Sequence, residues 1–482
     1  MALPTSTTLR RLAGVTITAG ALALAGFSPA AASPGDWTQL SQFPTGASYP
    51  GGRNIDQPTI ARFGPAVQVV WHGTMSPSAD SYFTAILDGA GNVTTPSREI
   101  VTGWADLIEN PSLISVGAQR LLGFSGLTPG RTGAAYYATS PDGATWSVGS
   151  GALSATQSAY ASYGFDVVDY GGTPVWVGNA GSTAGISWHV GISATDPAPA
   201  GSDGRLDITS CCSYGAAAAR DQVTGAVYAA YYSNSSVDSE QGIQAGQILP
   251  TLGAFAQAPQ SVVTSEGSIE SLDPGQRVAM TARPGGGVFV AYRVGYPSTD
   301  YIRVLNLVNG ATMTVPGSAG ARNISMSAGA DGRLWLAWID GDSLMTAQSN
   351  ATATVMGAAG SWSAPRRAST LWKTAVSAGS GTADVVLTAS VGGQINTWNT
   401  VINRTLTIDP DPGTPRRGRM VTITVSDAGS PVAGARVTFA GRSATTNRSG
   451  TVTLRAPGSA GSARITARKA GFHAGATVVR VR

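Results

Sequence analysis

One hairpin pattern recurs along most of this chain. A short alternating run, a tight turn and a second alternating run occupy residues 58–71, and the same arrangement occupies residues 111–124. Such runs, separated by Gly, Asp and Pro, are typical of β-strands, and no window has sustained helical periodicity. We therefore predict an all-β chain. Further copies of the hairpin end at Val177, Tyr231, Tyr292 and Trp338, and a degenerate copy ends near Ala389.

The spacing of the hairpins indicates which all-β fold the chain adopts. Their ends lie 53, 53, 54, 61, 46 and 51 residues apart along the sequence. A period of about 50 residues with several strands per unit is typical of a β-propeller. The hairpins predict a seven-bladed propeller over residues 33–408, and a six-bladed ring whose last copy serves as a linker is the alternative.

Tryptophan marks the expected outer strand of several blades. It follows a Gly or Asp turn at residues 142–146 and at residues 360–362. Residues 35–40 have the same pattern but precede the first hairpin. We therefore expect them to form the outer strand of the last blade, so that the N-terminal strand closes the ring and removes exposed sheet edges.

The turn Ser140-Pro-Asp-Gly-Ala-Thr-Trp146 resembles a short form of the Asp-box of sialidase-like propellers. In that family the Asp-box is a structural turn outside the active site, and the resemblance rests on one good copy. A sialidase would also carry an Arg-Ile-Pro segment near the first blade, which this chain lacks. The resemblance thus implies the fold and not sialidase activity.

The end of the chain has a different texture. After a linker at residues 409–414, alternating runs such as residues 421–426 and 451–454 fill residues 415–482. This segment resembles the Ig-like modules related to carboxypeptidase regulatory domains. The resemblance implies a small β-sandwich acting as a spacer or adhesion unit, without chemistry of its own.

The first 32 residues have the pattern of a secretory signal peptide. Arg10 and Arg11 precede the apolar run 12–27, and Ala30-Ala31-Ala32 offers a cleavage site. The apolar run is shorter than the roughly 20 residues of a spanning helix, which disfavours the alternative of a membrane anchor. We predict a secreted protein without a membrane span, exported by the general or the twin-arginine route.

Composition excludes several classes of partner. Charged residues make up 12% of the chain, the net charge is +4, and no basic run is interleaved with aromatics, so nucleic acid is not an expected ligand. The three histidines are scattered, and no spacing resembles a metal site. We expect a monomer that requires no cofactor.

The two cysteines, Cys211 and Cys212, are adjacent. Thiols tend to oxidise outside the cytoplasm, so we predict a vicinal disulfide, a strained ring that forces a tight turn. Two buried thiols are the alternative.

Candidate site residues come from the geometry of a propeller, in which the first strand of each blade lines the central channel. The residues just before these strands should meet at one mouth of that channel. They are Arg53 and Asp56, Glu109 and Asn110, Tyr163 and Asp166, Cys211 to Tyr214, Arg277, Arg322, and Trp372 with Lys373.

These residue types suit an acidic glycan. Asp56 and Glu109 are the candidate catalytic pair, because two carboxylates flanking a sugar can act as general acid and as base or nucleophile. Arg277 and Arg322 can grip a carboxylate in two-point fashion. The further candidates for substrate binding are Arg53, Tyr163, Asp166, Tyr214 and Lys373.

Three functions remain open from sequence. The first is a secreted glycoside hydrolase, or a lyase, acting on an extracellular polysaccharide or glycoconjugate. The second is a lectin-like propeller, and the third is a scaffold for surface contacts. The charged residues at the mouth could also be ion pairs that satisfy only one another. Trp71, Trp104 and Trp188 could extend a sugar-binding surface or belong to the core.

Overall fold

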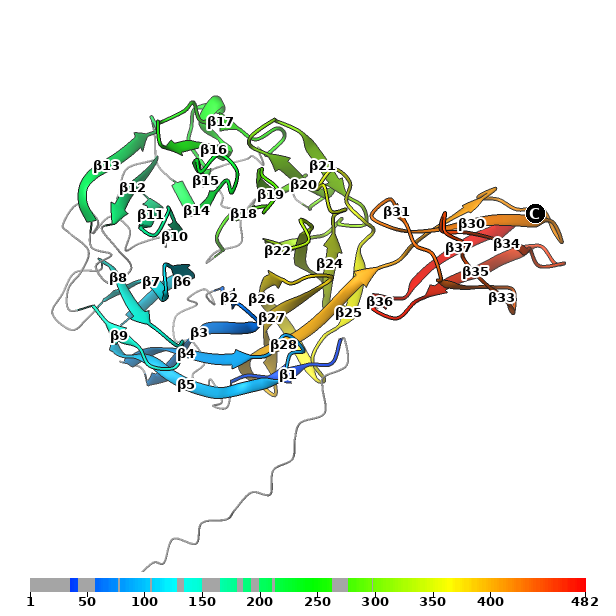
Figure 1. Cartoon of the computed structure of the whole chain (residues 1–482), viewed down its shortest axis with the longest axis horizontal. Coiled ribbons are helices and arrows are strands. Elements are labelled where there is room, and N and C mark those ends of the chain that lie inside the picture. The colour runs from blue at the N-terminus through cyan, green and yellow to red at the C-terminus, as the bar shows by residue number, and fades with distance from the viewer. Residues whose placement is uncertain are drawn as a thin grey trace, which may run out of the picture. The chain divides into compact units, whose positions relative to one another are not determined.

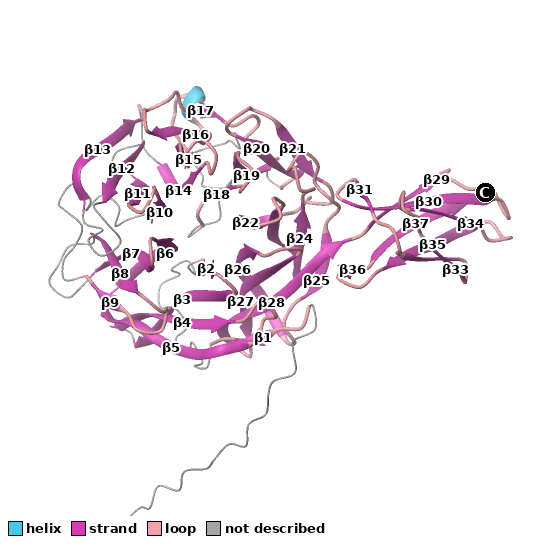
Figure 2. Cartoon of the chain, viewed as in Figure 1, coloured by secondary structure: helices cyan, strands magenta, loops and turns pink. Residues whose placement is uncertain are grey.

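Almost all of the regular structure is β-strand (Figure 2). This computed structural model describes residues 35–41, 57–76, 79–104, 106–127, 134–149, 165–179, 185–191, 199–209, 213–261, 276–296 and 298–482. Within those ranges the helical structure is one 3₁₀ turn, η2 (Asp238–Glu240). No helix there is long and apolar enough to cross a membrane. The predicted all-β class is confirmed.

Seven sheets follow one another along the described chain, each with four antiparallel strands in the order first to outermost; the seventh also contains the short parallel strand β36 (Phe472–His473). The first three sheets are β2 (Thr59–Phe63), β3 (Ala66–Ser76), β4 (Ala79–Leu87) and β5 (Val93–Trp104); β6 (Asp106–Val116), β7 (Gln119–Leu127), β8 (Ala134–Ser140) and β9 (Ser147–Val148); and β10 (Phe165–Asp169), β11 (Pro174–Asn179), β12 (Gly185–Gly191) and β13 (Pro199–Asp207).

The next three sheets have the same order of strands. They are β14 (Ser213–Arg220), β15 (Val227–Ser233), β16 (Gly242–Leu249) and β17 (Ala256–Gln257); β18 (Ala279–Ala282), β19 (Val288–Val294), β20 (Tyr301–Asn306) and β21 (Thr312–Val315); and β22 (Arg322–Ala328), β23 (Leu334–Asp340), β24 (Ser343–Gln348) and β25 (Gly360–Ser363).

The seventh sheet joins distant parts of the chain. Its strands β26 (Ala368–Ala378), β27 (Thr382–Val391) and β28 (Gln394–Thr405) are followed by β1 (Thr38–Gln39). Thr38 pairs with Asn399 and Gln39 with Trp398, and Leu40 is buried beside them. The N-terminal strand thus completes the last sheet, as its tryptophan pattern predicted.

The seven sheets form a closed ring (Figure 1). The first strand of each sheet contacts the first strand of the next, and β26 contacts β2. Apolar side chains fill the space between neighbouring sheets, as where Leu336 and Trp338 pack with Val304 and Phe289. This arrangement of radial sheets is that of a β-propeller.

Three tryptophans considered for a sugar-binding surface belong to the core instead. Trp71, Trp104 and Trp188 have relative exposures of 4, 6 and 5%. Trp104 packs edge-on against Tyr136 and Phe124 at centroid distances of 4.5 and 5.2 Å. Their large apolar area stabilises the contact between sheets, so they do not extend a binding surface.

Two further sheets form the C-terminal part of the chain. One contains β29 (Thr407–Asp411), β30 (Met420–Asp427), β31 (Ser430–Pro431) and β34 (Thr451–Arg455). The other contains β33 (Arg442–Thr445), β32 (Arg436–Phe439), β35 (Gly461–Arg468) and β37 (Gly475–Val481). Val421, Ile423, Phe439 and Ile465 are buried in their shared core.

The expected linker at residues 409–414 differs from what the structure contains. Asp409, Pro410 and Asp411 belong to β29, which pairs with β30, so the C-terminal sheets begin at Thr407. Proline is tolerated there because β29 is an edge strand that leaves one side of its backbone unpaired. Pro410 within this strand and Pro412 just after it explain why the sequence suggested a linker here.

Candidate functional site

A cavity of about 130 Å³ lies where the first strands of the ring converge. Residues from six of the seven sheets line it, which makes it the described part of the central channel. Its polar lining residues include Gln57, Asn110, Asp166 and Arg277, and its apolar ones include Met280, Ile324 and Val376. The channel mouth therefore gathers residues from blades that are distant in sequence, as the geometry of a propeller predicts.

Arg277 is the central cation of this cavity. Its Nη1 lies 3.2 Å from Oδ1 of Asp166, and its Nη2 donates a hydrogen bond of 2.9 Å to the backbone carbonyl of Asn110. The side chains of Arg277 and Asp166 are 19% and 13% exposed, so the pair is largely shielded from solvent. One guanidinium thus connects three sheets of the ring.

The carboxylate of Asp166 has further partners. The hydroxyl of Ser112 donates to Oδ1 at 2.7 Å, and the backbone N–H of Ala218 donates to Oδ2 at 3.0 Å. Asp166 in β10 is therefore fixed by β6 on one side and by β14 on the other.

Gln57 extends the network to the seventh sheet. Its backbone N–H donates to Oδ1 of Asn110 at 2.9 Å, and its side-chain Oε1 accepts the backbone N–H of Arg277 at 3.2 Å. Its Nε2 donates to the carbonyl of Thr374 at 2.8 Å. The residue just before the first strand, β2, is thereby hydrogen-bonded to three other sheets.

Several predicted site residues lie outside the described residues. Arg53, Asp56, Tyr163, Cys211 and Cys212 are among them. Glu109 belongs to β6, but its side chain is not described. In the sequence Asp56 immediately precedes Gln57, and Glu109 immediately precedes Asn110.

The remaining predicted residues do not line the cavity. Arg322 donates to the carbonyl of Gly341 in its own sheet at 3.3 Å. Lys373 is buried, with 5% of its surface exposed, next to a bulge in β26. Tyr214 stacks on Tyr232 at 6.3 Å. Of the described candidates, the structure brings Asp166 and Arg277 together with Asn110.

Sequence reasoning missed two members of the network, Gln57 and Ser112. Gln57 occupies the position just before an inner strand, so the rule that selected Asp56 could also have found it. Ser112 is harder to find, because a register shift between Ile108 and Ser112 in β6 decides which side chains face β10. Such a bulge re-aims side chains without a sequence signature.

The cavity can accommodate one group of a larger ligand. It is smaller than the roughly 300–1,000 Å³ of pockets for drug-sized ligands. It combines a guanidinium, a carboxylate and two amides, which together can donate to and accept from sugar hydroxyls and an anionic substituent. Within the described ranges no group of three or more His, Cys, Asp or Glu side chains could hold a metal ion.

Comparison with known proteins gives likenesses in structure alone. No protein-family model matches the chain, and no curated protein matches its sequence. The polysaccharide lyase Uly1 superposes over 74% of this chain and 94% of its own, with 8% identity and a TM-score of 0.44. The alpha-L-arabinofuranosidase of Fusarium graminearum, solved with arabinobiose, covers 63% of this chain and 95% of its own, with 10% identity and a TM-score of 0.42.

A lectin is similar to about the same degree. SapL1, solved in complex with alpha methyl fucoside, covers 65% of this chain and 97% of its own, with 12% identity and a TM-score of 0.41. At such identities none of these proteins transfers the role of a residue to this chain.

Proposed function

We propose that this protein is a secreted, carbohydrate-active β-propeller of seven blades that cleaves an extracellular glycan with acidic groups at its channel mouth. The observation that carries the proposal is the hydrogen bond of 2.9 Å from the backbone N–H of Gln57 to Asn110. The residues that directly precede these two in the sequence are Asp56 and Glu109, the two candidate carboxylates.

The chemistry assigned to this pair is that of a glycosidase. One carboxylic acid protonates the leaving oxygen of the sugar bond, and the second carboxylate activates water or attacks the sugar. The distance between the two carboxylates decides between inversion and retention. Arg277 provides the cation for an acidic group of the substrate, and Asp166 holds that cation in place. If the enzyme is a lyase acting on the same glycan, one of the two carboxylates acts as the base.

The decisive experiment is turnover of acidic and neutral polysaccharides, followed as released reducing ends. We expect Asp56→Asn and Glu109→Gln each to lower turnover by at least about 10²-fold while the thermal unfolding temperature stays unchanged. Asp409→Asn, at an exposed position in β29, is the matched control and keeps full activity. Absence of release from every glycan, or unchanged turnover in both variants, would refute the proposal.

A lectin-like function is the second candidate, and one observation argues against catalysis by the described residues of the channel cavity. Arg277, Asp166, Asn110 and Gln57 already satisfy one another, as in a channel mouth whose polar groups serve structure. A lectin would bind the glycan without releasing reducing ends. Its affinity would be insensitive to Asp56→Asn and Glu109→Gln, which separates it from an enzyme that also binds.

The organisation of the chain completes the proposal. Residues 1–32 act as the export signal, the ring carries the site, and the C-terminal sheets form an Ig-like module; the protein functions as a monomer without a cofactor. Cys211 and Cys212, adjacent in the sequence, form a vicinal disulfide. Unfolded, purified protein should then take up two alkyl groups only after reduction. Alkylation without reduction would show two free thiols.

A further inference from the structure

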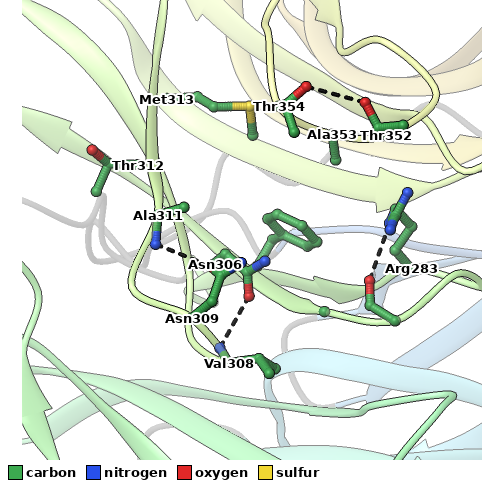
Figure 3. A pocket seen from close by; sticks show the side chains of 13 residues that line it. Arg283, Asn306, Val308, Asn309, Ala311, Thr312, Met313, Thr352, Ala353 and Thr354 are labelled. Atoms are coloured by element: carbon green, nitrogen blue, oxygen red, sulfur yellow. Dashed lines mark hydrogen bonds between the residues drawn. The ribbon is translucent and has the colours of Figure 1, made fainter.

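A second cavity, of about 270 Å³, lies between the sheet of β18 to β21 and the sheet of β22 to β25 (Figure 3). Hairpin turns line it: residues 283–287 between β18 and β19, residues 306–312 between β20 and β21, and residues 352–354 between β24 and β25. It lies at the opposite end of β18 from Arg277. This inter-sheet cleft is therefore separate from the channel cavity.

Arg283 is held rigidly at this cleft. Its Nε donates to the carbonyl of Gly286 at 3.0 Å, its Nη2 to that of Gly285 at 3.2 Å, and its Nη1 to that of Ala351 at 2.9 Å. The third bond crosses from one sheet to the next. All three acceptors are backbone carbonyls, so they position the guanidinium without neutralising its charge.

The same bonds leave part of the guanidinium available. A guanidinium carries five N–H groups, and the three bonds use one on each nitrogen. One N–H therefore remains on each of Nη1 and Nη2, and among the described residues Arg283 has no carboxylate within salt-bridge distance. Two N–H groups on one planar cation are the pair that binds a carboxylate at two points.

Neutral polar groups surround this cation. Asn306 accepts the backbone N–H of Val308 at 3.0 Å, which orients its amide, and within the described residues its Nδ2 has no acceptor. Across the cleft the hydroxyls of Thr352 and Thr354 lie 3.1 Å apart. Asn350 donates to Thr354 at 2.9 Å and fixes this turn. In Figure 3 the two threonines lie at the top of the view, Arg283 lies at the right and Asn306 lies left of centre.

The chemistry of the cleft selects a small hydroxylated anion. No acidic side chain lines it, and Phe289 and Met313 provide its apolar surface. We propose that the inter-sheet cleft is a binding site for a single uronic acid residue of a glycan. The carboxylate is bound by Arg283, and the sugar hydroxyls bind Asn306, Thr352 and Thr354. The site requires no catalysis and is independent of the channel cavity.

The test compares two ligands that differ only at the group Arg283 recognises. Methyl β-D-glucuronide carries a carboxylate where methyl β-D-glucoside carries a hydroxymethyl group. Titration calorimetry of the full chain should show the glucuronide bound at least about tenfold more tightly than the glucoside. Raising the salt concentration should weaken the binding of the glucuronide only, because Arg283 is partly exposed to solvent and its charge is screened.

Two variants assign the binding to the cleft. Arg283→Gln removes the charge, and Ala311→Trp fills the cleft from an exposed position that tolerates a large side chain. Each should lower glucuronide affinity at least about tenfold, whereas Arg366→Gln, at an exposed arginine of the β25–β26 connection, should not. Because Ala311 is exposed in the hairpin turn between β20 and β21, its variant remains informative if Arg283→Gln unfolds.

Three results would overturn the site: equal affinity for both probes, binding of neither by the wild-type protein, or unchanged affinity in both cleft variants. Turnover at the channel mouth is measured separately and should be unaffected by Arg283→Gln and Ala311→Trp. Failure of the proposed enzymatic activity and failure of the cleft site therefore give different results.

Discussion

Arg277, just before β18, and Asp166, in β10, form an ion pair of 3.2 Å, although they lie 111 positions apart in the sequence. Because Arg277 also donates to the carbonyl of Asn110, its removal leaves a partly buried carboxylate without its cation and a backbone carbonyl without this donor. We expect Arg277→Gln to lower the free energy of unfolding by about 2 kcal/mol, less than the 3–5 kcal/mol of a fully buried pair.

A double-mutant cycle separates the ion pair from packing. Arg277→Gln, Asp166→Asn and the double variant are compared by urea unfolding. The pair should give a coupling energy of at least about 1 kcal/mol, and additivity of the two single changes would contradict a direct interaction.

Asp427, at the end of β30, connects the C-terminal sheets to the ring. Arg404 approaches its Oδ2 to 3.0 Å, Arg333 approaches the same oxygen to 3.2 Å, and Gln348 donates to Oδ1 at 3.1 Å. The Asp427 side chain is only 3% exposed. Asp427→Ala should therefore destabilise the protein by about 3–5 kcal/mol, because Arg404 and Arg333 both lose a buried carboxylate. Arg333 keeps Asp331 at 3.5 Å as its remaining carboxylate.

The loss of stability in Asp427→Ala should fall mainly on the connection between the C-terminal sheets and the ring. Calorimetry should show the C-terminal sheets unfolding separately from the ring in Asp427→Ala and together with it in the wild type. Exposed Asp409→Asn serves as the control. A single unshifted transition in the Asp427 variant would show that the contact does not couple the two parts.

Asp384, in β27, makes stability depend on pH. Burial raises its pKa to about 6, although its ion pair with Arg62 acts in the opposite direction. Since this pKa exceeds the ordinary value of 3.8, the folded state binds the proton more tightly than the unfolded state. The stabilising contribution of the Asp384 proton to the free energy of unfolding is thus full below about pH 4 and is lost as the pH rises to about 6.

Asp384→Asn should remove this dependence. The difference in unfolding free energy between wild type and variant should change by up to about 3 kcal/mol between pH 4 and pH 7, in the direction that disfavours the wild type at higher pH. Urea unfolding at several pH values measures it. A difference that is constant with pH would show that folding does not shift the pKa of Asp384.

Gly143 sits in the turn between β8 and β9 with a φ of +78°, and a Cβ there would lie 2.0 Å from Nη1 of Arg120. Arg120 cannot move away freely, because it donates to Gln68 at 2.7 Å and lies over the ring of Phe63. Gly171, with a φ of +68°, has no atom within 4 Å of its Cβ position.

The two glycines form a matched pair. Gly171→Ala should cost about 1 kcal/mol for the left-handed backbone alone. Gly143→Ala should cost about 1–3 kcal/mol more, because it displaces Arg120 as well. Equal losses in thermal unfolding would mean that the turn relaxes without disturbing the contact between the first two sheets.

The hairpin repeat was sufficient to predict the ring, because alternation and turn residues are local properties of the sequence. The same holds for the strand at residues 38–39, whose tryptophan pattern marks an outer position. The partners of Arg277 were not predictable, since they depend on which side chains a bulge in β6 directs toward β10. Asp427 gave no sign of its role either, because an Asp before Ala-Gly is an ordinary turn residue in the sequence.

The pairing of β1 with β28 determines when the ring can close during synthesis of the chain. Thr38 is made early, and its partner Asn399 is added only after most of the chain exists. Until then the growing ring has two open edges and no means of closing. A chain that ends anywhere before residue 399 therefore cannot pair β1 with β28 and forms an incomplete ring. Closure of the ring thus requires a chain that extends at least to the last sheet.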